Sequence, residues 1–166
     1  MKNWSIKKII KEVVTTLLIL FVVSMALNYM RKPTTDSILP DIKANLISGE
    51  NISFRGDGTK PIIIHFWATW CPTCKLEAPN LESIKDDAHL VTIAVNSGTD
   101  EELKSFMKER GYTYKVVNDK SSKISERFGV GAFPTTFIYD SNGTLKFSEV
   151  GYSTTLGLKA RINLIN

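Results

Sequence analysis

Cysteine and histidine are scarce in this chain of 166 residues, which contains only two of each. The cysteines are Cys71 and Cys74, and the histidines are His65 and His89. A structural zinc site takes about four ligands, and the two histidines fall in separate predicted elements. Soft thiolates suit Cu(I), but no methionine or histidine cluster accompanies the pair. We therefore expect no metal site and no cofactor, with a dithiol that holds Cu(I) as the alternative.

Outside its N-terminal segment the chain also lacks an excess of basic residues. The formal net charge is +4, but residues 1–32 carry six lysines and arginines against one glutamate, which leaves −1 for the remainder. Nucleic-acid recognition requires a basic patch on the folded part of a protein. We therefore expect no nucleic-acid partner. Internal repeats and low-complexity tracts are absent as well.

A run without charge follows the basic N-terminus, from Val13 to Met30. Eighteen helical residues span roughly 27 Å, close to the thickness of a bilayer core. The preceding lysines favour a cytoplasmic N-terminus. Ser24-Met25-Ala26 offers a signal-peptide cleavage site as the alternative, but the run is long for a signal sequence. The predicted organisation is a cytoplasmic basic segment (1–12), a transmembrane anchor (13–30), a linker (31–40) and one domain (41–166).

Hydrophobic patterning within the domain alternates between strands and helices. Strands are predicted over residues 62–67, 90–95, 114–117, 135–139 and 145–150, with a hairpin inside 42–54. Helices are predicted after Pro72 and over residues 99–110, 122–128 and 154–165. Thr99 and Glu102 form a capping-box pair, and Asn142-Gly143 predicts a type I′ turn. Because early strands alternate with helices and a hairpin comes late, we predict an α/β fold whose mixed central sheet is flanked by helices.

The two cysteines lie where the buried strand 62–67 passes into a helix. A helix N-terminus carries partial positive charge and free N–H groups, which stabilise the thiolate, the reactive form of cysteine. A disulfide three residues apart closes a very small ring, so it constrains the unfolded chain little and is unsuited to a purely structural role. The pattern favours a redox-active dithiol.

Two stretches resemble the thioredoxin superfamily: residues 65–74, His-Phe-Trp-Ala-Thr-Trp-Cys-Pro-Thr-Cys, and residues 133–137, Phe-Pro-Thr-Thr-Phe. The form Trp-Ala-Thr-Trp-Cys-x-x-Cys-x-x-Glu-x-Pro, from Trp67 to Pro79, is similar to that of membrane-tethered TlpA/ResA-type thiol–disulfide oxidoreductases, nearest to the suppressor-of-copper-sensitivity D group. The resemblance covers Leu39 to the C-terminus and implies a thioredoxin fold. It also implies a monomeric, single-pass protein of the bacterial inner membrane with its domain in the periplasm. Such a protein exchanges disulfides with exported proteins, mostly as a reductant fed by a membrane thiol electron carrier.

Three residues of the active helix receive chemical roles. We expect Cys71 to form the mixed disulfide with a partner and Cys74, one turn deeper, to resolve it. Glu77 lies one further turn along the same face and is placed to take the proton of Cys74. The resemblance supports a working acid at this position, and the competing interpretation is a solvated helix charge.

The remaining site residues flank the pair. Pro134 matches the cis-proline that faces the cysteines in the superfamily, and the Phe133 backbone would bind an extended substrate strand. Trp70 is expected to form an apolar docking surface, whereas Trp67 packs in the core. His65 occupies a place where thioredoxins carry a buried aspartate. We interpret it as a hydrogen-bonded core histidine or as a modulator of the Cys74 thiol, and not as catalytic.

Two other functions compete with a disulfide oxidoreductase. One is a copper-handling or chaperone-like binding module that uses the same dithiol. The other is a thiol peroxidase, but peroxidases of similar fold place a threonine three residues before the cysteine, where this chain has Ala68. The sequence does not fix the direction of electron flow, since Pro72-Thr73 between the cysteines carries no charge.

Overall fold

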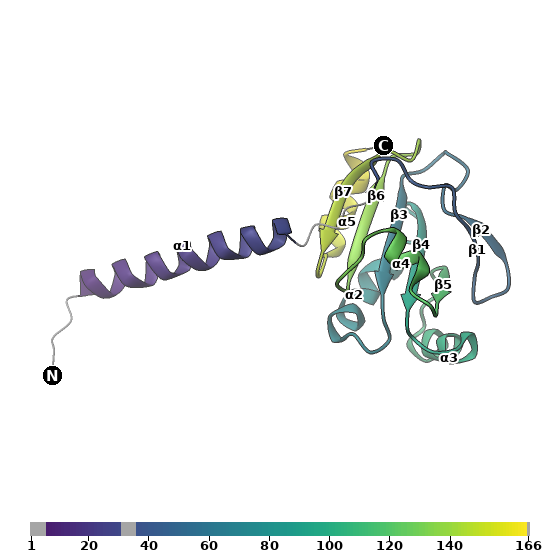
Figure 1. Cartoon of the computed structure of the whole chain (residues 1–166), viewed down its shortest axis with the longest axis horizontal. Helices are drawn as coiled ribbons and strands as arrows, with labels where there is room; N and C mark the ends of the chain where they lie inside the picture. Colours follow the sequence, from purple (N-terminus) through teal and green to yellow (C-terminus); the bar gives the residue numbers. More distant parts are fainter. Residues whose placement is uncertain (1–5, 31–35, 166) are drawn as a thin grey trace. The chain divides into compact units, whose positions relative to one another are not determined.

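The computed structural model describes residues 6–30 and 36–165. The chain divides into two compact units, Met1–Lys32 and Pro33–Asn166. The first unit contains α1 (Ile6–Met30) (Figure 1). Ten apolar side chains of this helix, between Ile10 and Val23, are exposed. Among the described residues, no helix combines the length and the apolar character needed to cross a membrane. The anchor over residues 13–30 stays a prediction.

A five-stranded mixed sheet forms the centre of the second unit. Its strands are β3 (Ile62–Trp67), β4 (His89–Val95), β5 (Val116–Asp119), β6 (Thr135–Tyr139) and β7 (Leu145–Val150). Their order is β5-β4-β3-β6-β7. The pairs β3–β4 and β4–β5 are parallel, whereas β3–β6 and β6–β7 are antiparallel. This arrangement confirms the predicted mixed sheet.

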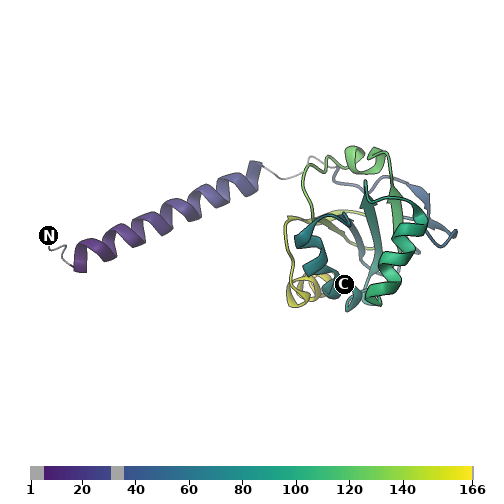
Figure 2. The same cartoon turned by 90° about the horizontal axis from the view of Figure 1, so that it is seen from below.

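Helices cover both faces of this sheet. The helices of the unit are α2 (Pro72–Glu82), α3 (Asp100–Arg110), α4 (Lys123–Arg127) and α5 (Thr155–Asn163). Figure 2 shows α4 on one side of the sheet and α2, α3 and α5 on the other. The predicted hairpin is a separate two-stranded sheet of β1 (Lys43–Asn45) and β2 (Asn51–Ser53), and its Ile52 packs in the same cluster as Phe128, next to α4.

All six residues of β3 are buried because the strand is central and covered on both faces. Side chains alternate along a strand, so successive residues enter different cores. Ile63 and Trp67 join the cluster that holds Cys71 and Cys74, while Ile62, Ile64 and Phe66 join the other. β3 therefore contributes side chains to two cores, one on each face of the sheet. The chain runs from β3 to the start of α2, where Cys71 and Cys74 pack in the first of these cores.

Local sequence signals set the ends of α3 as predicted. The Thr99 hydroxyl accepts a hydrogen bond from the Glu102 N–H, and the Glu102 carboxylate accepts one from the Thr99 N–H, which completes the capping box. Gly111 ends the helix in the left-handed region at φ 68°, which glycine adopts without steric penalty.

The turn between β6 and β7 differs from the predicted type I′ turn. That turn needs positive φ at both central residues, but of Asn142 and Gly143 only Gly143 has one. Instead, Asp140 organises a wider turn: its carbonyl accepts from the Gly143 N–H and its carboxylate from the N–H groups of Asn142 and Thr144. A side-chain acceptor within the loop explains why the Asn-Gly signal alone was misleading.

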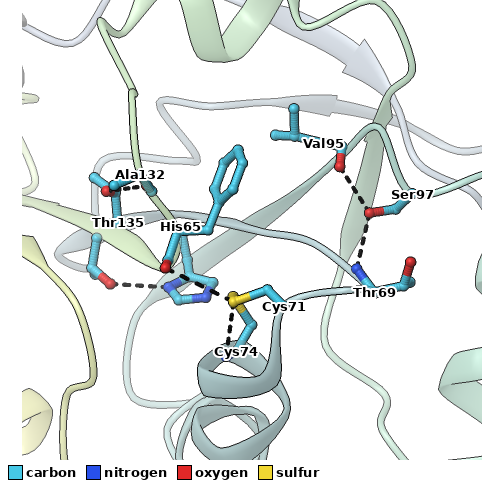
Figure 3. Close-up of a disulfide and its surroundings, with 10 residues drawn as sticks. His65, Thr69, Cys71, Cys74, Val95, Ser97, Ala132 and Thr135 are labelled. Atoms are coloured by element: carbon cyan, nitrogen blue, oxygen red, sulfur yellow. Dashed lines mark hydrogen bonds between the residues drawn. A yellow bond between two sulfur atoms is a disulfide. The ribbon is translucent and has the colours of Figure 1, made fainter.

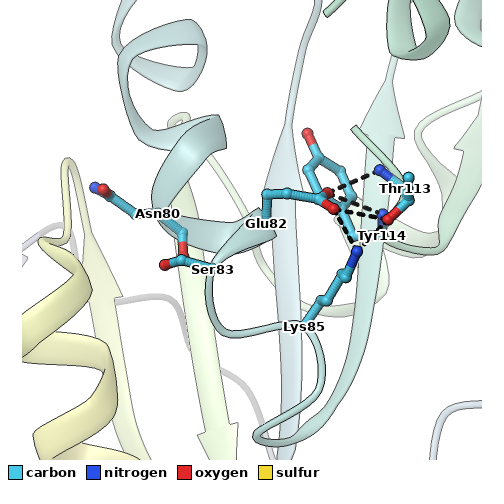
Figure 4. Close-up of polar contacts among 6 residues, drawn as sticks. All are labelled: Asn80, Glu82, Ser83, Lys85, Thr113 and Tyr114. Carbon is cyan, nitrogen blue, oxygen red and sulfur yellow. Dashed lines mark hydrogen bonds and ion pairs between the residues drawn. The ribbon is translucent and has the colours of Figure 1, made fainter. Parts of the chain in front are cut away.

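A carboxylate fixes the C-terminal end of α2 (Figure 4). Glu82 accepts hydrogen bonds from the Thr113 N–H at 2.7 Å, the Thr113 hydroxyl at 2.6 Å and the Lys85 ammonium at 2.5 Å. Burial alone would raise the pKa of Glu82, but these bonds outweigh it and hold the pKa at about 2. The contact ties α2 to the segment before β5 and so fixes the helix that carries both cysteines.

Candidate active site

Cys71 and Cys74 form a disulfide at the start of α2. Cys71 is the N-cap of this helix, Pro72 is its first residue, and the Cys74 N–H donates to the Cys71 sulfur at 3.2 Å. The expected position at a strand-to-helix junction is confirmed. In the oxidised state the two side chains are almost equally buried, 5% and 3% exposed.

The loop before β6 lies against this disulfide. The Phe133–Pro134 peptide bond is cis, as the resemblance implied, and the Phe133 carbonyl oxygen lies 3.8 Å from the Cys71 sulfur (Figure 3). Pairing of β6 with β3, in the register Phe66↔Thr135, brings this loop to the cysteines.

Beside Cys71 two aromatic residues form an apolar surface. Trp70 is 58% exposed, and its ring meets that of Phe133 edge-to-face with centroids 5.7 Å apart. The indole N–H donates to the Asn96 carbonyl at 3.1 Å, which fixes the ring's orientation. Trp67 is buried against Phe106, as predicted. The geometry leaves Trp70 available to a docking partner, and that role stays a prediction.

Glu77 is fully buried, so its interpretation as a solvated helix charge is wrong. Its Oε1 accepts a hydrogen bond from the Ser153 N–H at 3.1 Å, while its Oε2 has no partner among the described residues. Burial raises the pKa of Glu77 to about 7, although the bonds from Ser153 oppose the rise. A carboxyl that titrates near neutrality one helical turn from Cys74 suits a proton acceptor.

His65 is also fully buried. Its Nδ1 lies 2.9 Å from the Thr136 hydroxyl, while its Nε2 has no partner among the described residues. Burial lowers the pKa of His65 to about 3, so the ring is neutral at physiological pH. Figure 3 shows the ring beside the disulfide.

Several supporting contacts could not be predicted from the sequence. Ser97 accepts a hydrogen bond from the Thr69 N–H at 3.0 Å and donates one to the Val95 carbonyl, which fixes the approach to Cys71 (Figure 3). Ser153 is separated from Glu77 by 76 residues. No local motif marks either serine, because each acts through tertiary contact.

The arrangement is suited to thiol–disulfide exchange, since it combines a dithiol at a helix N-terminus, a cis-proline loop and a buried acid. Within the described part of the chain, no group of three or more histidine, cysteine, aspartate or glutamate side chains is arranged to hold a metal ion.

Comparison with known proteins agrees with this geometry. A family model described as the AhpC/TSA family matches residues 35–148. The chain is 27% identical over 159 residues to a thioredoxin-like protein of Haemophilus influenzae, with 95% of each chain covered. It is 32% identical over 120 residues to sporulation thiol-disulfide oxidoreductase A of Bacillus subtilis, which covers 68% of this chain and 72% of that protein.

Two further similar proteins are also thiol–disulfide oxidoreductases or share this fold. The thiol-disulfide oxidoreductase ResA of Geobacillus thermodenitrificans is 30% identical over 136 residues, which covers 78% of this chain and 76% of that protein. The crystal structure of StoA from Bacillus subtilis superposes with a TM-score of 0.66 at 26% identity, over 75% of this chain and 98% of that one. The chain therefore belongs to the AhpC/TSA family of thioredoxin-fold proteins, as a thiol–disulfide oxidoreductase of the ResA/StoA type.

Proposed function

We propose that this oxidoreductase works as a reductant of disulfides in exported proteins. In the proposed reaction the Cys71 thiolate attacks a partner disulfide and forms a mixed disulfide, and one partner sulfur leaves as a thiolate. Glu77 then takes the proton of Cys74, whose thiolate attacks the Cys71 sulfur and releases the second partner sulfur. The cysteine pair loses two electrons and the partner gains two. A membrane thiol electron carrier would return the pair to the dithiol.

The observation that carries this direction is the burial of the pair among apolar side chains. The sulfurs lie in a cluster of apolar side chains, and their polar surroundings are the Cys74 N–H, the Phe133 carbonyl and the neutral His65 ring. Burial disfavours thiolates. The start of α2 stabilises a thiolate on Cys71, but burial works against it, and a reduced form with weak net stabilisation of its thiolates gives a low reduction potential, which is the property of a reductant.

Measuring the reduction potential of the Cys71–Cys74 couple in the full chain tests this direction. We expect equilibration with dithiol buffers to give a value near the roughly −270 mV of thioredoxin. Insulin reduction by the chemically reduced chain should accompany it, and a Cys71→Ser variant should lose it. A potential near about −120 mV, typical of a strong oxidant, would contradict the proposal.

We also propose that residues 13–30 hold the enzyme in the bacterial inner membrane, with the domain in the periplasm. Support comes from the uncharged run and the preceding lysines, and from the exposed apolar side chains of α1. Disulfide chemistry is natural in such an oxidising compartment. The chain should stay with membranes in alkaline carbonate, and externally added protease should digest the domain in spheroplasts. Release by carbonate, or a protected domain, would contradict this location.

A further inference from the structure

One polar atom near the disulfide has no role in the mechanism above. The Nε2 of His65 is fully buried and lacks a hydrogen-bond partner among the described residues. Buried polar atoms are nearly always hydrogen-bonded, because an unmet one retains the full desolvation penalty. An unmatched atom beside a redox centre points to a partner that is present in another state of the reaction.

The position of His65 on β3 directs its ring toward the cysteines. Ile63 and Trp67, two residues to either side, both belong to the core cluster that contains Cys71 and Cys74. Side chains at alternate positions share one face of a strand, so His65 lies on that face as well. Its Nδ1 is engaged with the Thr136 hydroxyl, and Figure 3 shows the ring beside the disulfide.

The two sulfurs differ in the hydrogen bonds that they receive. The Cys71 sulfur accepts the Cys74 N–H at 3.2 Å, whereas no donor to the Cys74 sulfur is found in the described part of the chain. A thiolate on Cys74 is therefore the species that needs a donor. Two buried side chains on this face have an unused nitrogen among the described residues, His65 and Trp67. The Trp67 ring packs against Phe106 and Tyr114, whereas Figure 3 shows the His65 ring beside the disulfide, so His65 is the candidate donor.

The charge state of His65 decides what its free nitrogen offers. Burial lowers the pKa of this imidazole to about 3, so it does not take up a proton near neutrality. A neutral ring carries one N–H. When the Thr136 hydroxyl donates to Nδ1 across their 2.9 Å contact, the ring proton is on Nε2.

We propose that the Nε2–H of His65 donates a hydrogen bond to the Cys74 sulfur once the disulfide opens and so stabilises the thiolate that resolves the mixed disulfide. The inference rests on the proposed exchange roles of Cys71 and Cys74. Two buried groups then have separate roles. Glu77 takes the proton from Cys74, and His65 stabilises the negative charge that remains on the sulfur.

The polar and titratable side chains near the His65 ring, other than the cysteines, do not take the role proposed for it. Strand β4 presents Thr92 beside His65 in the parallel register, and the Thr92 hydroxyl donates to the Lys115 carbonyl. The titratable side chains that other segments bring to the same core are Cys71, Cys74, Glu77, Tyr114 and the partly buried Tyr112.

The test titrates Cys74 in the full chain carrying Cys71→Ser, where Cys74 is the one remaining thiol. Thiolate is followed by its ultraviolet absorbance, with His65→Leu, His65→Gln and the matched control Thr92→Val added in turn. Loss of a hydrogen bond to a charged group predicts about a tenfold smaller thiolate fraction at a given pH in His65→Leu. The amide N–H of His65→Gln should restore most of it, and Thr92→Val should change nothing.

An unchanged titration in His65→Leu would overturn the proposal, and so would a Thr92→Val effect of equal size or a glutamine variant no better than leucine. If His65→Leu does not fold, ¹⁵N chemical shifts of the unsubstituted reduced protein decide: a proton on Nε2 supports the proposal, and one on Nδ1 overturns it. None of these readouts involves exchange with a partner. Failure of insulin reduction would therefore affect the proposed function and not this inference.

Discussion

Replacing Glu77 with glutamine tests the buried acid most directly. The carboxyl is fully buried with one oxygen unpartnered, and its pKa is raised from 4.5 to about 7. An acid whose pKa is raised on folding stabilises the fold fully below its unfolded pKa. That stability is lost as pH rises from about 4.5 to 7 and changes little above. The difference between the pKa of 4.5 and the folded-state pKa of about 7 corresponds to at most about 3 kcal/mol in the free energy of unfolding.

Glu77→Gln keeps the shape and removes the charge. The full chain, oxidised and unfolded by denaturant at a series of pH values, should therefore show a variant that is more stable than the parent above pH 7 by about 1–3 kcal/mol. At low pH, where the parent carboxyl is neutral, the difference should vanish. Equal stability of the two proteins across this range would refute the reasoning about burial.

The same variant tests the proton transfer. Oxidation of the dithiol by a small disulfide should accelerate in the parent as pH rises through about 7, because the ionised Glu77 accepts the Cys74 proton. In Glu77→Gln this inflection should disappear, and the rate at neutral pH should fall by about 10²-fold, a usual contribution of a general base. Glu82→Gln is the matched control, since this carboxylate lies on the same helix with its pKa at about 2. An unchanged pH profile in Glu77→Gln would remove the residue from the mechanism.

Three further predictions concern the cysteines, the end of α2 and the aromatic surface. Cys74→Ser should trap partner proteins as mixed disulfides on non-reducing gels, and trapping by Cys71→Ser instead would reverse the assigned roles. Glu82→Gln should lower the free energy of unfolding at neutral pH by about 1 kcal/mol, because the partly exposed carboxylate loses a charge-assisted contact. The parent should lose this advantage as pH falls from 4.5 to about 2, and an acid unfolding curve identical in the two proteins would argue against the contact. Trp70→Ala should slow reduction of a protein disulfide about tenfold, the usual effect of losing an exposed aromatic anchor. Its exchange with dithiothreitol should stay the same, so equal slowing of both would indicate a disturbed active site.

The sequence predicted the fold well where the signal is local. The capping box at Thr99 and Glu102 and the apolar run of β3 rely on neighbours within a few residues, and both elements formed as expected. The turn after β6 did not, because the side chain of Asp140 replaced the Asn-Gly geometry with its own hydrogen bonds.

By itself the sequence determined the reactive pair: two cysteines three positions apart, with Pro72 between them, where a buried strand enters a helix. Only the tertiary structure decided the environment of that pair. Glu77 became a buried acid because segments distant in the chain pack over it, and Ser153, 76 residues away, donates a hydrogen bond to it. His65 became a neutral ring because the packed sheet and helices bury it completely, and β6 places Thr136 against it. Burial and distant hydrogen bonds set proton affinities, and both depend on how segments far apart in the chain pack together.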